Sequence, residues 1–237
     1  MTTGSHIHDE PNTLRHGNPE RIKEYISGNY DEQNAEIVSH LFDLLLRFGP
    51  LPQNFTDKDL GSLFDYLVPL ITTSYYSRRQ LLLSAGQVSQ YIYFLQKGLA
   101  RGFYTDQKTG REVTDFLWHE GSLITVPDSF FQQQPSQLFM EVMPETELLS
   151  ISYNDLMGCI TKYPLMELFL RNVILRYNAH TTRRSHQLVF LSAWERYLEL
   201  LKTHPAIEQQ VSKEVIASYL HITPQSLSRM LKEKRHP

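Results

Sequence analysis

The last 27 residues read Val211-Ser-Lys-Glu-Val-Ile-Ala-Ser-Tyr-Leu-His-Ile-Thr-Pro-Gln-Ser-Leu-Ser-Arg-Met-Leu-Lys-Glu-Lys-Arg-His-Pro237. They hold two amphipathic segments separated by a short turn at His221. Ser212 is placed to cap the first segment, and Thr223 and Pro224 take the cap and first position of the second. The apolar residues predicted to face inward are Ile216, Ala217, Leu220, Ile222, Leu227, and Met230 or Leu231. This pattern predicts a helix-turn-helix, and it leaves open an αα-hairpin of a helical bundle with a polar outer face.

The outward face of the predicted second helix carries side chains that suit DNA. Arg can make two hydrogen bonds to guanine, and Gln can do the same to adenine. The predicted base-reading residues are Gln225, Ser226 and Arg229. The predicted phosphate contacts are Thr223, Lys213 and Lys232. The whole chain has a net charge of −3, but residues 211–237 carry five basic residues against two acidic ones. The helix is therefore expected to enter the major groove of double-stranded DNA.

The periodicity changes between about residues 71 and 151. Short apolar and aromatic runs there alternate with glycine-containing turns at intervals of about 8–12 residues. The predicted strands are 80–83, 91–95, 99–104, 113–118, 138–142 and 147–151. This spacing predicts an all-β barrel or sandwich, with the aromatic side chains in its core rather than around a cofactor.

Helical spacing flanks this β region on both sides. Helices are predicted at 35–48 and from Thr56, which can form a capping box with Asp59. After the β region, the predicted helices are a short one from Tyr153, a long one at 165–191 and a third at 193–203. The apolar stripe of the long helix is too long for a small C-terminal domain to cover. A homodimer formed through this helix is therefore expected.

Over about residues 35–235 the chain resembles the CRP/FNR family of transcription regulators. The most specific stretches are Ala193-Trp-Glu-Arg-Tyr-Leu-Glu-Leu-Leu and the segment from Ile216 to Arg229. They are similar to a branch common in Bacteroidetes-type bacteria. The resemblance implies an α+β fold with an N-terminal jelly roll of the cyclic-nucleotide-binding type, a long dimerisation helix and a C-terminal helix-turn-helix. The predicted parts are a flexible extension at 1–34, a sensor domain with flanking helices at 35–162, the dimerisation helix at 163–191, and a DNA-binding domain without a full wing at 192–237.

Besides the lack of a full wing, the resemblance identifies a departure in the turn of the predicted DNA-binding domain. The family usually has glycine in the turn, where this chain has His221. A left-handed turn disfavours a non-glycine residue, although histidine is among the better-tolerated types. The family's base-reading positions fall on Pro224, Gln225 and Arg229, and Pro224 cannot read a base edge.

The jelly-roll pocket departs from the family as well. In cyclic-AMP-binding members, a Gly-Glu pair and an Arg-Ser or Arg-Thr pair hold the ribose and the phosphate. Here the first pair falls on Val126-Pro127, and no lysine or arginine occurs between Arg111 and Lys162. A buried phosphodiester would lack its countercharge. The residues of this degenerate pocket are Val126, Pro127, Asp128, Ser129, Pro135 and Ser136. The pocket is expected to have no cyclic-nucleotide affinity, so it binds another small molecule, binds a partner or is vestigial.

Enzyme, metal and membrane functions find no support in the sequence. Cys159 is the only cysteine, so one chain cannot build a disulfide framework or a cysteine-rich zinc site. There is no P-loop, dinucleotide fingerprint or Gly-x-Ser-x-Gly motif, and the histidines lack ligand spacing. No cofactor, metal or membrane span is expected, and the predicted location is cytoplasmic. The favoured function is a DNA-binding regulator, and the alternative is a jelly-roll ligand or partner module whose C-terminal hairpin no longer binds DNA.

Overall fold

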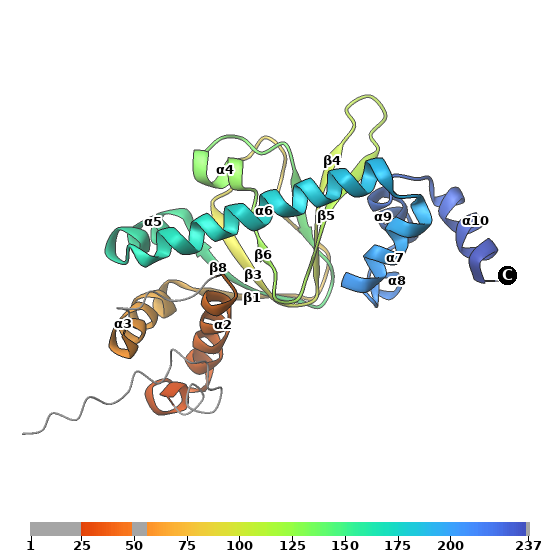
Figure 1. The fold of residues 1–237 in the computed structure, drawn as a ribbon. Coiled ribbons are helices and arrows are strands. Elements are labelled where there is room, and N and C mark those ends of the chain that lie inside the picture. The colour runs from red at the N-terminus through yellow and green to blue at the C-terminus, as the bar shows by residue number, and fades with distance from the viewer. Residues whose placement is uncertain (1–24, 49–55, 236–237) are drawn as a thin grey trace, which may run out of the picture. The chain divides into compact units, whose positions relative to one another are not determined.

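The computed structural model describes residues 25–48 and 56–235 (Figure 1). Contacts divide the chain into two units, one of residues 1–70 with 159–169 and the other of residues 71–158 with 170–237. Most of the predicted extension at 1–34 lies outside the described residues. Within its described part, residues 25–29 are helical and Ile26 is buried.

The first unit is helical. It contains α2 (Glu32–Phe48), α3 (Asp57–Leu67) and the short 3-10 helix η2 (Val68–Leu70). Both longer helices bury one apolar face, and the rings of Phe42 and Phe64 pack edge to face. The predicted capping box at the start of α3 is confirmed, because Thr56 accepts a hydrogen bond from the backbone of Asp59 and the Asp59 carboxylate accepts one from the backbone of Thr56.

The second unit contains two antiparallel four-stranded sheets. The first has the strand order β1-β8-β3-β6 and the second the order β2-β7-β4-β5. The strands are β1 (Thr72–Tyr76), β2 (Gln80–Leu83), β3 (Tyr91–Lys97), β4 (Leu99–Thr105), β5 (Glu112–His119), β6 (Leu123–Ile124), β7 (Phe139–Val142) and β8 (Thr146–Ser152). A shared core includes Leu83, Leu95, Ile124, Met140 and Leu148. The predicted jelly roll is confirmed.

Helices follow the β region, as predicted. They are α5 (Tyr153–Lys162), α6 (Leu165–Phe190), α7 (Ala193–Thr203), α8 (Ile207–Gln210), α9 (Lys213–Tyr219) and α10 (Pro224–Arg235), and a short α4 (Pro127–Gln132) lies between β6 and β7. On α6, the rings of Tyr177 and His180 stack on the ring of Phe116 in β5, with ring centroids 5.2 and 4.9 Å apart. Figure 1 shows α6 leading towards the C-terminal helices. Within residues 25–48 and 56–235, no helix has the length and apolar character needed to span a bilayer.

Candidate nucleic-acid interface

The helix-turn-helix is built around α9. Ser212 caps this helix by accepting a hydrogen bond from the backbone of Val215. Ile216, Ala217 and Leu220 are almost completely buried, as the spacing predicted. Ala217 is small enough to let a neighbouring helix approach closely. These residues belong to one apolar cluster with Leu227 of α10.

The same apolar cluster continues into the jelly roll through Leu99, Leu117 and Met143. Polar contacts reinforce this junction at β5, the outer strand of its sheet. The hydroxyl of Ser218 accepts a hydrogen bond from the backbone N–H of Thr114 at 2.7 Å and donates one to the carbonyl of Glu112 at 2.9 Å. Ser218 thereby satisfies two backbone groups on the open edge of β5.

The turn between the two helices has a left-handed residue where the sequence predicted one. His221 has a φ of 52°. Its backbone N–H donates to the Ser218 carbonyl, and that of Ile222 donates to the Ala217 carbonyl, each at 3.0 Å. This pair of bonds is the Schellman motif, in which glycine is the usual left-handed residue. His221 therefore adopts the left-handed conformation at the position where the family usually has glycine.

The start of α10 is capped by Thr223. Its hydroxyl accepts a hydrogen bond from the backbone N–H of Ser226 at 3.1 Å and donates one to the Ser226 hydroxyl at 2.9 Å. Thr223 is exposed, whereas Ser226 is half-buried. The hydroxyl of Ser226 therefore accepts a hydrogen bond within the cap, and its own O–H can still donate one.

The outer face of α10 presents Gln225, Arg229 and Lys232 to solvent. Their spacing of four and three residues places them along one side of a helix. Ser228 is exposed on the same side, although it was not among the predicted contact residues. Its signal in the sequence is its position three residues after Gln225 and four before Lys232. Leu227 points the other way and is completely buried.

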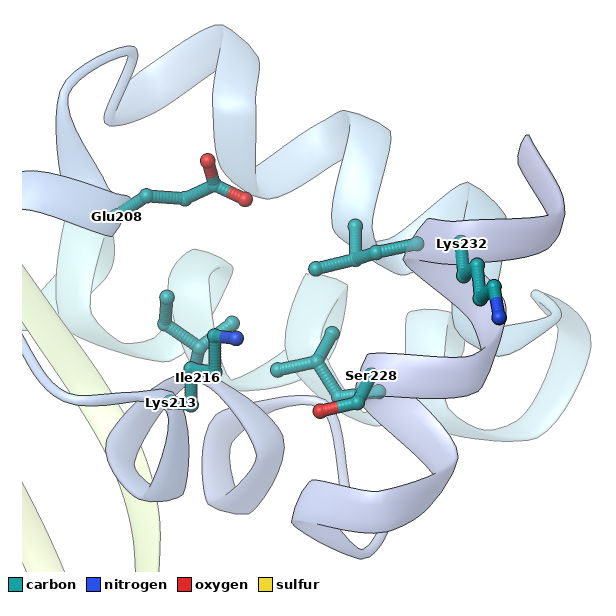
Figure 2. A pocket seen from close by; sticks show the side chains of 7 residues that line it. Glu208, Lys213, Ile216, Ser228 and Lys232 are labelled. Atoms are coloured by element: carbon teal, nitrogen blue, oxygen red, sulfur yellow. The ribbon is translucent and has the colours of Figure 1, made fainter. Parts of the chain in front are cut away.

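A groove of about 390 Å³ runs between α8, α9 and α10 (Figure 2). Its polar residues include Lys213 from the first position of α9, and Ser228 and Lys232 from α10. Its apolar lining comes from Ile216, Leu227 and Leu231, and Glu208 of α8 completes it. The Glu208 carboxylate accepts a hydrogen bond from the hydroxyl of Tyr197. The structure therefore brings the two predicted phosphate-binding lysines to one groove, although they are 19 residues apart in the sequence.

The arginines beside β5 have a different environment. A second cavity of about 410 Å³ lies between the sheet and α9, with Arg79, Arg101 and Arg111 in its lining. Arg101 is almost completely buried, and its guanidinium pairs with the carboxylates of Glu141 and Glu112. Glu141 also pairs with Arg79. Arg79 and Arg101 thus form ion pairs with carboxylates, and these pairs leave less positive charge in the cavity for a phosphate.

The six residues of the degenerate pocket lie at and around α4. Val126, Pro127, Ser129 and Ser136 are buried, and Asp128 and Pro135 are exposed. The Ser129 hydroxyl accepts from the backbone N–H of Ser89 at 2.8 Å and donates to the Gln134 carbonyl at 2.7 Å. The Ser136 hydroxyl donates to the Leu138 carbonyl at 2.8 Å. The chain's own backbone therefore engages both hydroxyls, and the charged member of the set is acidic.

Comparison with known proteins identifies the fold. No family model matches the chain, and no curated protein does. A putative CRP/FNR transcriptional regulator from Eubacterium rectale is similar in structure, with a TM-score of 0.62 at 14% identity over 80% of this chain and 88% of that one. FixK2 from Bradyrhizobium japonicum gives 0.58 at 16% identity over 69% and 83%. The c-di-GMP-responsive regulator CLP from Xanthomonas campestris gives 0.57 at 16% over 74% and 91%. The chain therefore has the fold of CRP/FNR-type regulators.

Proposed function

We propose that this protein is a DNA-binding transcription regulator of the CRP/FNR type rather than an enzyme. The observation that carries the proposal is the outer face of α10, where Gln225, Arg229 and Lys232 are exposed behind a capped helix start. A capped helix with a polar outer face and a fully buried inner residue, Leu227, suits the role of a recognition helix. The similarity of the 193–201 and 216–229 stretches favours the branch common in Bacteroidetes-type bacteria.

The proposed contacts follow from the position of each residue. Gln225 and Arg229 read base edges in the major groove, with Ser226 beside them. Lys213 and Lys232 neutralise phosphates from the groove that they share, and Thr223 contributes a phosphate contact near the start of α10. Ser228, which lines the same groove, is added to the phosphate contacts.

The proposed assembly is a homodimer through α6. Leu175 and Val189 are 14 residues apart, which is two heptads, and so lie on one face of a supercoiled helix pair. Their exposed fractions are 56% and 73%, and that of Phe190 is 70%. Exposed apolar residues repeated along one helix are what a second copy would cover. A dimer would present two recognition helices to two half-sites.

The proposed sensor domain does not bind cyclic AMP. The pocket residues around α4 supply no cation for a phosphate, and Ser129 and Ser136 already bond to the backbone. A small-molecule effector of another chemistry is compatible with this arrangement. The alternative function is that of a ligand-binding or partner-binding module that does not bind DNA.

The test is a binding titration on the promoter of the neighbouring operon, at salt concentrations from about 50 to 200 mM. We expect the wild type to form a specific complex whose affinity falls steeply with salt. Lys232→Ala should lower the salt slope by about one unit. Lys108→Ala is the matched control, because Lys108 is an exposed cation on the β4–β5 turn. If the wild type binds no genomic fragment at low salt, the regulator proposal is rejected in favour of the partner module.

A further inference from the structure

The carbonyl groups at the end of α9 fall into two sets. The last carbonyls of a helix lack partners within the helix, and each needs one when it is buried. The carbonyls of Ile216, Ala217 and Ser218 accept hydrogen bonds from the backbone N–H groups of Leu220, Ile222 and His221. The carbonyls of Tyr219, Leu220 and Ile222 lie further along the chain, and the Schellman motif provides no donor for them.

Three arginines supply those missing donors. Arg184 donates to the carbonyl of Tyr219. Arg196 donates twice to the carbonyl of Leu220, through Nε at 3.2 Å and Nη2 at 2.9 Å. Arg111 donates through Nη2 to the carbonyl of Ile222 at 3.2 Å. The turn from Tyr219 to Ile222 is therefore held by side chains from outside the helix-turn-helix.

The three arginines come from separate parts of the fold. Arg111 immediately precedes β5, Arg184 lies in α6, and Arg196 lies in α7. Arg196 also donates to the carbonyl of Leu191, between α6 and α7. These bonds thus fix the orientation of the turn relative to the jelly roll, α6 and α7.

Arg184 is the most constrained of the three. Its side chain is only 4% exposed, and its guanidinium lies 3.9 Å from the ring centroid of Tyr219. Asp115 is 3.9 Å from its Nε, while Nε and Nη1 have no hydrogen-bond partner. Burial lowers the pKa of Arg184. The free-energy cost of burying this guanidinium must be offset by the contacts that it makes. One of them is the hydrogen bond from Nη2 to the carbonyl of Tyr219 in the turn.

We propose that Arg111, Arg184 and Arg196 are positioning residues for DNA recognition, because together they hold the left-handed turn at His221 and so set the angle between α9 and α10. The proposal rests on the proposed function and names what orients its recognition helix. A glycine turn would adopt this conformation readily, whereas histidine needs the surrounding structure to impose it. The arginines impose it here through the turn's own carbonyls.

The test compares Arg184→Met with Arg183→Met. Arg183 is the neighbouring residue on α6 and is exposed, so its replacement removes the same charge from the same helix. Hydrogen exchange of the His221 and Ile222 amides in the full-length protein reports on the turn directly. We expect Arg184→Met to accelerate this exchange about tenfold, and Arg183→Met to change it less than about twofold.

DNA binding supplies the second measurement. Arg184→Met should weaken the specific complex about tenfold while leaving the salt slope unchanged, because the arginine bonds to the turn and not to a phosphate. Adding His221→Gly should restore most of that affinity, since glycine adopts the turn without the arginine. His221→Gly alone is the reference, because glycine also stabilises the fold by itself, and only a larger gain in the Arg184→Met background assigns the loss to the turn.

Three outcomes would overturn the proposal. One is equal exchange in Arg184→Met and Arg183→Met, and another is a salt slope lowered by about one unit in Arg184→Met, which would make Arg184 a phosphate contact. The third is loss of affinity without rescue by His221→Gly. If Arg184→Met does not fold, Arg111→Met replaces it, because Arg111 is exposed and its removal leaves no buried cavity. If wild type forms no specific complex, the proposed function fails, and the exchange measurement still decides whether the arginines hold the turn.

Discussion

The rim of the jelly roll at α4 and the helix-turn-helix use their polar groups in opposite ways. At α4, the hydroxyls of Ser129 and Ser136 bond to the chain's own backbone. Phe130, also on α4, is completely buried. On α10, Gln225 and Arg229 extend into solvent, while Leu227 on the inner face of the same helix is completely buried.

This difference bears on where the proposed recognition takes place. A polar group bonded within the chain offers little to a ligand, because a new contact must replace an existing one. Exposed long polar side chains on a rigid helix can bind without breaking internal bonds. The difference supports the proposal that α10 recognises nucleic acid, and it indicates a packing role for the residues around α4.

The largest expected effect comes from Phe130 on the α4 side. Phe130→Ala should lower the free energy of unfolding by about 3–5 kcal/mol, because it empties a fully buried site that contacts Phe131 and Tyr153. Chemical denaturation would measure the change. Phe131→Ala is the matched control and should cost less, since Phe131 is only half-buried. Equal effects of the two substitutions would mean that α4 is loosely packed and open to a ligand.

A pH effect of smaller size is expected where the end of α7 meets the end of β5. Burial, with a contribution from His119, lowers the pKa of His204 to about 4. Its folded pKa lies below its unfolded value of about 6.5, so the unfolded chain binds the proton more readily between these values. Stability should therefore fall by up to about 3 kcal/mol as the pH drops from about 6.5 to about 4.

His204→Gln is the variant that isolates this contribution. It should flatten the dependence of the unfolding free energy on pH in that window. Replacing His186, which is exposed on α6, provides the control and should leave the slope as it is. An unchanged slope in His204→Gln would assign the pH dependence to other groups.

On the α10 side, the expected effect concerns binding rather than folding. Arg229→Ala should weaken specific DNA binding by about 1–3 kcal/mol and relax the preference at one base position. Its thermal unfolding should be nearly unchanged, because Arg229 is exposed. Competition with sequence variants of the operator would measure both the loss of affinity and the relaxed base preference. If Arg229→Ala left the specific complex unchanged, the recognition helix would have to be assigned elsewhere.

The sequence predicted the elements of this fold well where local pattern determines them. The predicted bounds of β2 at 80–83 and α7 at 193–203 match the structure. β1 was not predicted as a strand, because its residues Thr72–Tyr76 form no apolar run and are mostly exposed. β6 has two residues, which is too short for a periodicity to appear.

For the candidate site, the sequence predicted the turn and the caps but not the partners that hold them. Thr223 and His221 follow from local rules for helix ends. The bond from the Thr114 backbone to Ser218 joins residues 104 positions apart, and that from Arg111 to the Ile222 carbonyl joins residues 111 positions apart. No periodicity encodes such contacts, since they depend on how the helix-turn-helix packs on β5.

The smallest expected effect is that of cyclic AMP on the wild type, and it tests the α4 side of the comparison most directly. A ligand present at 100 times its Kd would stabilise the folded state by about 2.7 kcal/mol. We expect cyclic AMP to leave the thermal unfolding temperature unchanged, because a buried phosphate would face Asp128 and bonded serine hydroxyls with no arginine to neutralise it. Calorimetry with cyclic AMP and cyclic GMP would check the same point without unfolding. Micromolar binding in that experiment would require a basic group to reach the pocket from outside residues 112–161, and it would make the region around α4 a ligand site rather than a packed one.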